Sequence, residues 1–224
     1  FLGNIWFNIE WVERYNLPFV FELYPGGTFS LYDDISDNKL RRVMNSPCFQ
    51  KVIVTQDVTR NYLLENNFCR EEDIVEIFGV AVPEGHLSLP VPQKMRANNK
   101  ALKVCFAAMR YSAYGYDKGY DIYIDVIREL CKKNLNIEFH VCGAYDEKIL
   151  PLNGLEEVVC FHGIMDNHSL GELLKEMDVI VSPNRTGKLS VGSFDGFPTG
   201  TCIEAGLCGA LIVTTDPLEL NNDR

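Results

Sequence analysis

The sequence predicts an α/β protein of two Rossmann-like domains with parallel sheets, and three observations lead to this expectation. Short apolar runs that suit buried strands alternate with amphipathic stretches that suit helices over most of the 224 residues. A stretch without hydrophobic periodicity, residues 83–100, interrupts the alternation. The alternation then resumes, so we expect a first domain at residues 1–82, a linker at 83–100 and a second domain at 101–224.

The first half of the chain shows the alternation clearly. Three stretches carry apolar side chains at helical spacing: residues 4–15, 36–46 and 57–67. Three short apolar runs suit buried strands: residues 19–24, 51–55 and 74–78. The turn Pro25-Gly26-Gly27 follows the first of these runs and offers either a close approach of the backbone to a ligand or a plain tight turn.

The second half repeats the pattern over a longer stretch. Five apolar runs suit strands: residues 102–108, 137–142, 157–162, 178–182 and 210–215. Helices are expected at residues 118–133 and 169–177, and a short one near Pro198. A Rossmann-like domain of this order normally continues with a further strand and helix, so we expect the second domain to be incomplete in this chain.

Composition narrows the class of protein. A net charge of −10 argues against general nucleic-acid or anionic-membrane binding. No apolar run approaches the roughly 18 residues of a membrane helix, and the chain begins at Phe1 without a signal-peptide layout. We therefore expect a cytoplasmic protein, present here as a fragment.

The eight cysteines are scattered and form no C-x-x-C pair. Several stand in apolar runs, as in Val104-Cys105-Phe106 and Val159-Cys160-Phe161, which favours reduced cysteines in a core. The four histidines do not cluster with the cysteines along the sequence, so we expect no metal site.

One stretch, residues 194–209, has the composition of a ligand site. Asp195 and Glu204 bracket a Gly/Thr-rich turn at a predicted helix start. Backbone N–H groups at a helix N-terminus favour phosphate oxygens, and carboxylates accept hydrogen bonds from sugar hydroxyls. The stretch therefore suits a polyhydroxylated, anionic ligand, although Glu204 taken alone is better explained as a solvated helix residue.

Two cations flank the loop after the first strand of the second half. Arg110 and Lys118 follow the carboxyl end of a predicted parallel strand, where ligands bind in open α/β sheets. Both side chains suit phosphate, and the alternative is a pair of solvated surface cations. Arg185 and Lys188 offer further positive charge, or belong to a mobile surface loop.

Absent motifs exclude several functions. The chain has no Asp-x-Asp pair, the commonest carboxylate arrangement for a metal-bound sugar nucleotide. It also lacks G-x-G-x-x-G and G-x-x-x-x-G-K, which argues against dinucleotide oxidoreductases and nucleoside triphosphatases.

Six fragments in a fixed order resemble those of the retaining GT-B glycosyltransferases of family 4, the group 1 glycosyltransferases. They are Ala107-Ala108-Met109-Arg110 with Lys118-Gly119, Val141-Cys142-Gly143, Phe161-His162-Gly163, Asp178-Val179-Ile180-Val181-Ser182-Pro183, Asp195-Gly196-Phe197-Pro198 and Glu204-Ala205-Gly206-Leu207-Cys208-Gly209. The resemblance covers residues 102–216 well and the first half more loosely. It implies two Rossmann-like domains facing across a cleft, both incomplete in this chain.

The resemblance also implies roles for individual residues. Arg110 and Lys118 would contact the diphosphate of a nucleotide-sugar donor, and Glu204 would hold its ribose. The candidates for facing the donor sugar and phosphates are Asp195, Gly196, Phe197, Thr199, Gly200 and Thr201. Asp195 departs from the family pattern because it is not Glu and because eight residues, not seven, separate it from Glu204. Glu22, at a strand end of the first half, is a candidate catalytic residue on the acceptor side.

The implied activity is sugar transfer with retention, without metal or cofactor, from a nucleotide-diphosphate sugar to a glycan or lipid-linked acceptor. Such an enzyme builds a surface polysaccharide or glycolipid, and any peripheral contact with the membrane is expected through parts absent from this chain. Two alternatives stay open: a nucleotide-sugar epimerase of the same fold, and a non-catalytic module that binds a nucleotide sugar.

Overall fold

The structure, a computed structural model, describes residues 1–77, 100–196 and 198–218. Within these ranges it contains two parallel sheets and splits into two compact units. The first unit contains residues 1–77, 186–196 and 216–218, and the second contains residues 100–185 and 198–215. The predicted linker at 83–100 lies outside the described residues, apart from Lys100. None of the described helices is long and apolar enough to cross a membrane.

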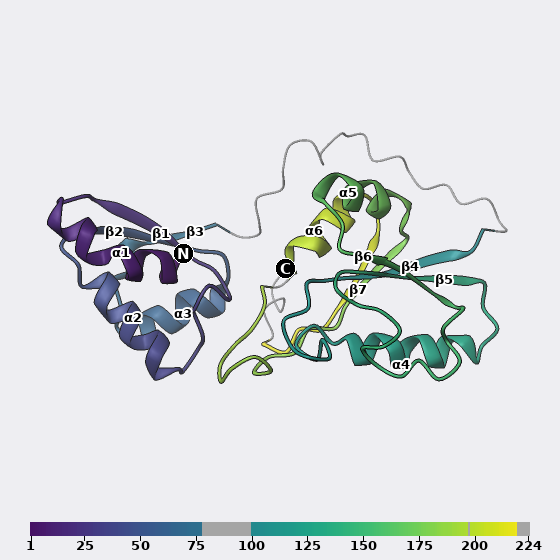
Figure 1. The fold of residues 1–224 in the computed structure, drawn as a ribbon. Coiled ribbons are helices and arrows are strands. Elements are labelled where there is room, and N and C mark those ends of the chain that lie inside the picture. The colour runs from purple at the N-terminus through teal and green to yellow at the C-terminus, as the bar shows by residue number, and fades with distance from the viewer. Residues whose placement is uncertain (78–99, 197, 219–224) are drawn as a thin grey trace. The chain divides into compact units, whose positions relative to one another are not determined.

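The first unit has a three-stranded parallel sheet with helices packed against it (Figure 1). Its strands are β1 (Phe19–Leu23), β2 (Phe49–Val54) and β3 (Ile74–Glu76), in that order across the sheet. Its helices are α1 (Leu2–Arg14), α2 (Asp34–Met44), α3 (Asp57–Glu65) and the 3-10 turn η1 (Glu71–Asp73). Alternating residues such as Phe21 and Leu23 face the core, where they meet Leu40 and Val43 of α2. All six elements expected in this half are present.

A loop from the C-terminal half completes this core. The Phe194 ring packs edge-on against Phe29, with ring centroids 5.9 Å apart. The Leu31 N–H donates to the Gly192 carbonyl at 3.0 Å, so residues 186–196 are held by both side chains and backbone. Gly192 must be glycine here, because a Cβ would lie 1.6 Å from the Leu31 carbonyl oxygen.

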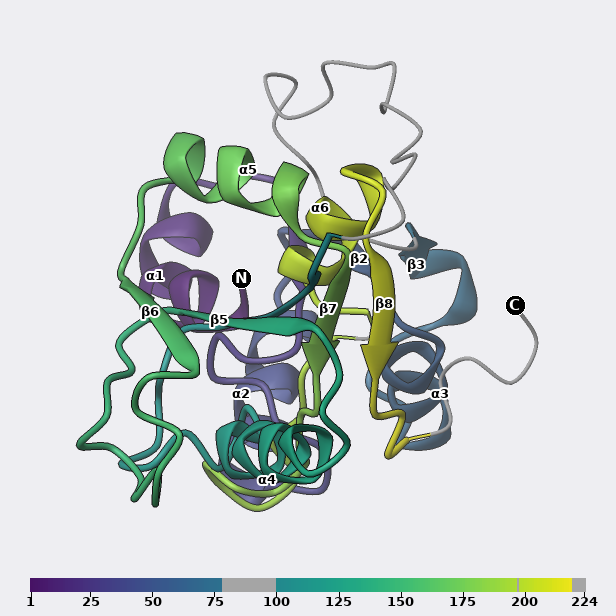
Figure 2. The same cartoon turned by 90° about the vertical axis from the view of Figure 1, so that its right-hand side faces the viewer.

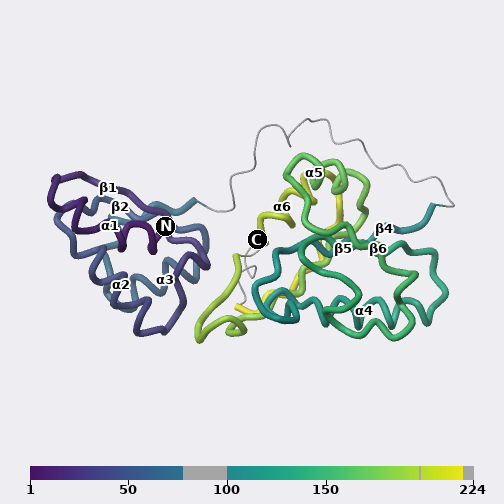
Figure 3. Tube along the Cα trace, in the orientation of Figure 1, coloured from purple at the N-terminus to yellow at the C-terminus, as the bar shows by residue number. Residues whose placement is uncertain are grey.

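The second unit has a five-stranded parallel sheet in the order β6-β5-β4-β7-β8. Its strands are β4 (Leu102–Ala107), β5 (Ile137–Cys142), β6 (Val159–Gly163), β7 (Val179–Ser182) and β8 (Leu211–Thr214). The helices are α4 (Tyr120–Cys131), α5 (Asn167–Glu176) and α6 (Gly200–Leu207), and Figure 3 follows the chain through them. The strand order reverses between β4 and β7, which places a topological switch point there.

Helices cover both faces of this sheet (Figure 2). On one face, Tyr123 and Ile127 of α4 pack against Phe106 and Val141. On the other, Leu174 of α5 and Cys202 of α6 pack against Cys105, Cys142 and Ile180. The alternation of side chains along each strand thus divides them between two apolar layers.

All eight cysteines are free thiols, and four of them, Cys48, Cys105, Cys142 and Cys202, are buried as predicted. Cys160 differs, because it is exposed although it stands between two apolar residues. It lies on β6, the edge strand of the sheet, where the apolar neighbours Val159 and Phe161 point to the opposite face from Cys160.

Candidate functional site

The loops after β4 and β7 meet at the switch point of the second sheet. Gly119, in the left-handed conformation (φ 70°), lies against Pro183, and a Cβ at Gly119 would be 2.0 Å from the Pro183 carbonyl oxygen. The Arg185 N–H donates to the Asp117 carbonyl at 2.9 Å. The Arg185 guanidinium also bonds the Asp121 carboxylate at 2.8 Å. The positive charge of Arg185 is therefore engaged in joining the two loops.

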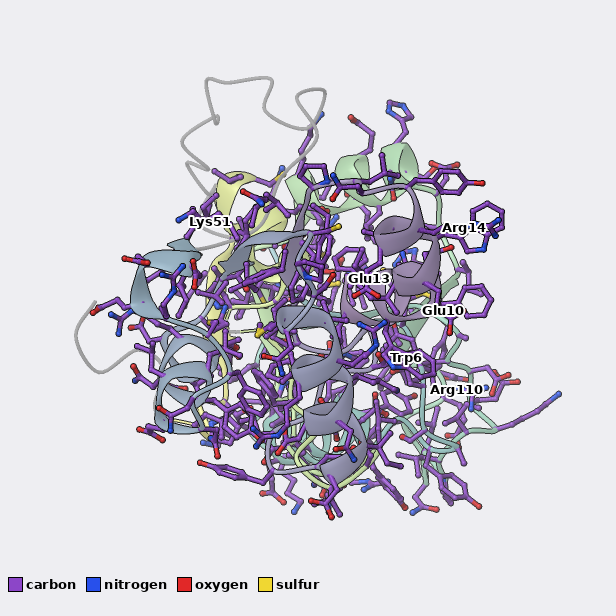
Figure 4. The ribbon with its side chains drawn as sticks, turned by 90° about the vertical axis from the view of Figure 1, so that its left-hand side faces the viewer. Trp6, Glu10, Glu13, Arg14, Lys51 and Arg110 are labelled. Atoms are coloured by element: carbon purple, nitrogen blue, oxygen red, sulfur yellow. The ribbon has the colours of Figure 1, made fainter. Side chains whose placement is uncertain are left out.

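Two backbone carbonyls hold the side chain of Arg110, which is labelled in Figure 4. Its Nε donates to the Ala144 carbonyl at 2.8 Å, and its Nη1 donates to the Ala113 carbonyl at 2.7 Å. Ala144 follows the carboxyl end of β5, so the guanidinium spans the loops after two neighbouring strands. Neither bond neutralises the charge, which leaves Arg110 cationic at the carboxyl edge of the sheet.

Lys118 is 9% exposed, an unusual burial for an ammonium group. Its Nζ lies 5.2 Å from the centroid of the Tyr111 ring, within the range of a cation–π contact. The solvated-cation alternative therefore fails for Lys118, because its surroundings keep the cation inside the loop.

Asp117, next to Lys118, is a buried carboxylate that the sequence analysis did not single out. Its Oδ1 accepts hydrogen bonds from the backbone N–H and the hydroxyl of Ser112. Its Oδ2 is buried and has no hydrogen-bond partner among the described residues, and the same holds for the Tyr145 hydroxyl. Burial, followed by the Asp117 charge, raises the pKa of Tyr145, so this phenol remains a hydrogen-bond donor. The sequence signal was a carboxylate beside a cation in a loop at a strand end.

The start of α6 supplies backbone donors at the same edge. Thr199 is the N-cap, and its side chain makes no capping hydrogen bond to the helix. The first N–H groups of the helix, beginning with Gly200 and Thr201, have no carbonyl partner within the helix, and N–H groups in this position favour anionic ligands. Because α6 follows the loop after β7, these donors lie at the carboxyl end of the sheet, as Arg110 and Lys118 do.

Glu204 lies in the middle of α6 and lines a small cavity between α5 and α6. His168, Glu172 and Lys175 of α5 line the same cavity. The Lys175 ammonium pairs with Glu172 at 2.6 Å. Glu204 is thus partly buried against polar side chains, which distinguishes it from a fully solvated helix residue.

The remaining candidates belong to the first unit or lie outside the described residues. Asp195 and Gly196 follow the Phe194 anchor and are partly buried. Glu22 is partly buried on β1, pointing away from the core side chains Phe21 and Leu23. The two carboxylates Asp195 and Glu204 therefore belong to different units. Phe197 lies outside the described residues.

The sequence and the fold of this chain were compared with those of known proteins. The family model described as "Glycosyl transferases group 1" matches residues 102–222. None of the curated proteins matches the chain in sequence. Among solved structures, a mutant of S. aureus TarM in complex with fondaparinux, alpha-GlcNAc-glycerol and UDP is 17% identical, with a TM-score of 0.63 over 96% of this chain and 40% of that one.

Two further structures are similar. WaaG, a glycosyltransferase involved in lipopolysaccharide biosynthesis, is 13% identical, with a TM-score of 0.63 over 96% of this chain and 64% of that one. The pneumococcal O-GlcNAc transferase GtfA, in complex with UDP and GlcNAc, is 16% identical, with a TM-score of 0.62 over 93% of this chain and 39% of that one. At these identities the likeness establishes the predicted GT-B fold, and the chain spans between 39% and 64% of each of these structures.

Proposed function

The chain belongs to the glycosyl transferases of group 1, and from this premise we propose that its protein transfers a sugar from a nucleotide-diphosphate sugar to a glycan or glycolipid acceptor. The observation that best supports this proposal is the set of groups at the carboxyl edge of the second sheet. There Arg110, the buried Lys118 and the uncapped N-terminus of α6 gather positive charge and backbone donors. Such groups suit a diphosphate.

The donor site follows from these groups. Arg110 and Lys118 bind the diphosphate, while the turn at Thr199, Gly200 and Thr201 donates backbone hydrogen bonds to phosphate and sugar oxygens. Glu204 accepts hydrogen bonds from the ribose hydroxyls. Two of the similar structures contain UDP, which supports a nucleoside diphosphate as the donor's leaving group.

The reaction we assign is transfer with retention at the anomeric carbon and without a divalent metal at the diphosphate. As the bond to the sugar breaks, charge develops on the leaving diphosphate, and the fixed cations and amides stabilise it without reorganising. The sequence supports the metal-free assignment, since it has no Asp-x-Asp pair to hold a metal-bound sugar nucleotide.

The first unit supplies the acceptor side in this proposal. Asp195 and Gly196 follow a loop anchored on its core, and Glu22 lies on β1 in the same unit. Asp195 faces the donor sugar, and Glu22 orients the glycan or lipid-linked acceptor. Holding both substrates in a reactive geometry contributes much of the rate enhancement of such a transfer.

Calorimetric titration of UDP and GDP, and of their sugars, tests the donor site directly. Glu204→Ala should weaken nucleotide binding at least about tenfold, or roughly 1.4 kcal/mol, because the ribose loses its acceptor. Glu129→Ala is the matched control, since it removes an exposed carboxylate of α4 that pairs with Lys132. Equal affinity in Glu204→Ala and the parent chain would refute the ribose assignment.

Activity needs a donor and acceptor screen with the full-length protein, followed by product analysis. A transferred sugar with the anomeric configuration of the donor is the expected result. A change of configuration would exclude retention. Interconversion of the nucleotide sugar without an acceptor would indicate an epimerase, and binding without any turnover would indicate a non-catalytic module.

A further inference from the structure

A cluster of nitrogen and sulfur ligands lies on the edge of the second sheet, within β5 and β6. His140 on β5 and Cys160 on β6 are direct partners in the parallel register. His162 follows Cys160 by two residues, at the point where the register between the strands shifts. A shift of this kind re-aims a side chain, and here the His162 ring stacks on His140 with centroids 5.2 Å apart.

The ligand atoms converge. Nδ1 of His140 lies 3.0 Å from Nε2 of His162. One ligand atom from each of His140, Cys160 and His162 lies within 4.8 Å of the other two. Bond lengths of about 2.0–2.3 Å in a tetrahedral zinc site place ligand atoms roughly 3.3–3.8 Å apart. Small side-chain rotations therefore bring the three atoms to that spacing, and exposed Cys160 rotates most easily.

A carboxylate stands behind the first of these ligands. Nε2 of His140 is buried without a hydrogen-bond partner among the described residues, and its residue is only 8% exposed. The Glu138 carboxylate lies 3.7 Å from this nitrogen. A metal on Nδ1 fixes the ring proton on Nε2, facing Glu138, and a carboxylate behind a ligating histidine is the usual outer partner in zinc sites.

From this geometry we infer that His140, Cys160 and His162 bind a zinc-type transition-metal ion, with Glu138 as the outer partner of His140. Two imidazoles and a thiolate suit such an ion better than magnesium or calcium, which prefer oxygen ligands. The charges balance, because a divalent cation meets one thiolate and one carboxylate. Three protein ligands leave a fourth position to water.

Binding of the ion also requires an account of the protons on its ligands. The ion replaces the hydrogen bond between the two histidines, and the Cys160 thiol releases its proton to solvent. The site ties the edge strand β6 to β5, and it is separate from the residues assigned to the donor.

The test uses the reduced 224-residue chain, stripped of metal and titrated with Zn²⁺ and with Co²⁺ as a spectroscopic probe. We expect one ion per chain, and a thiolate-to-cobalt charge-transfer band. Cys160→Ser should abolish the band, and His162→Gln should weaken zinc binding at least about 100-fold. Glu138→Gln should weaken it about 10- to 100-fold while the band persists, as expected for an outer partner.

Two controls separate this site from adventitious binding. His168→Gln removes an exposed histidine of α5, and Cys131→Ser removes a partly buried thiol of α4, both outside the cluster. Both variants should bind one ion as the parent chain does. The inference is overturned if the parent chain shows no band, if Cys160→Ser retains it, or if Cys131→Ser loses it. Because Cys160 is exposed, its serine variant leaves the core intact, which circular dichroism checks.

Discussion

Gly143 lies so close to Ala108 that a Cβ at Gly143 would be 2.0 Å from the Ala108 carbonyl oxygen. Its φ of 119° also falls in a region that side chains rarely adopt. The next residue is Ala144, whose carbonyl accepts the Arg110 hydrogen bond. The missing side chain at 143 thus allows the loops after β4 and β5 to approach and fixes the position of the guanidinium.

Gly143→Ala should destabilise the second unit by more than about 3 kcal/mol, since backbone strain and a steric clash act together. Gly154→Ala is the matched control, because Gly154 also has a positive φ (94°) but has nothing within 4 Å of its Cβ position. That variant should cost only about 1–2 kcal/mol. Urea denaturation followed by circular dichroism measures the free energy of unfolding of both variants. Equal losses of stability would show that the close contact with Ala108 does not add to the effect of the positive φ.

Phe194 should hold the loop of residues 186–196 on the first unit. Phe194→Ala removes the ring that packs on Phe29 and costs about 3–5 kcal/mol if the site does not collapse. Trypsin should then cleave after Lys188 faster than in the parent chain, because the loop opens locally more often. Val191→Ala, which truncates a side chain 75% exposed in the same loop, is the control. Similar cleavage rates in both variants would contradict the anchoring role.

An ion pair joins α1 to α2 in the first unit. Both carboxylate oxygens of Glu13 accept hydrogen bonds from the Arg42 guanidinium at 2.7 Å. The hydrogen bond from Arg42, with a second contribution from Ser46, lowers the pKa of Glu13 from 4.5 to about 2. A folded-state pKa below the unfolded value stabilises the fold at pH values above 4.5, and this contribution disappears as pH falls through about 2.

Glu13→Gln should therefore be less stable than the parent chain near neutral pH, and the difference should shrink as the solution is acidified toward the pKa of Glu13. Thermal unfolding at a series of pH values measures the difference. Glu10→Gln, on the same helix and exposed, is the control (Figure 4). A Glu13→Gln deficit that stays constant with pH would mean that ionisation of Glu13 is not the cause.

The sequence predicted the elements of the fold well, because each strand and helix here follows its own hydrophobic period. It also placed Arg110 and Lys118 correctly at the carboxyl edge of a parallel sheet, since that position follows from chain order alone. It could not show that Lys118 is buried over Tyr111, or that one oxygen of Asp117 has no hydrogen-bond partner in the part of the chain that the structure describes, because both depend on how one loop folds back.

Two further features depend on contacts distant in sequence. Residues 186–196 read as a loop of the second domain, yet they belong to the first unit through contacts with Phe29 and Leu31. His140 and Cys160 are twenty positions apart, so their spacing along the chain does not predict that they meet. The patterns Glu138-Phe139-His140 and Cys160-Phe161-His162 contain the clue, because alternate residues on neighbouring strands share a face.

Arg110 and Lys118 give the most direct prediction about the donor. Arg110→Gln and Lys118→Met each remove one positive charge while keeping most of the side-chain volume. Each should lower the affinity for UDP at least about tenfold, or roughly 1.4 kcal/mol, and leave the affinity for uridine unchanged, because only the diphosphate needs the charge. Arg128→Gln on α4, where the guanidinium pairs with Asp125, is the control for general charge effects. Equal losses for UDP and uridine would show that these cations do not bind phosphate, and a loss in Arg128→Gln would point to long-range attraction instead.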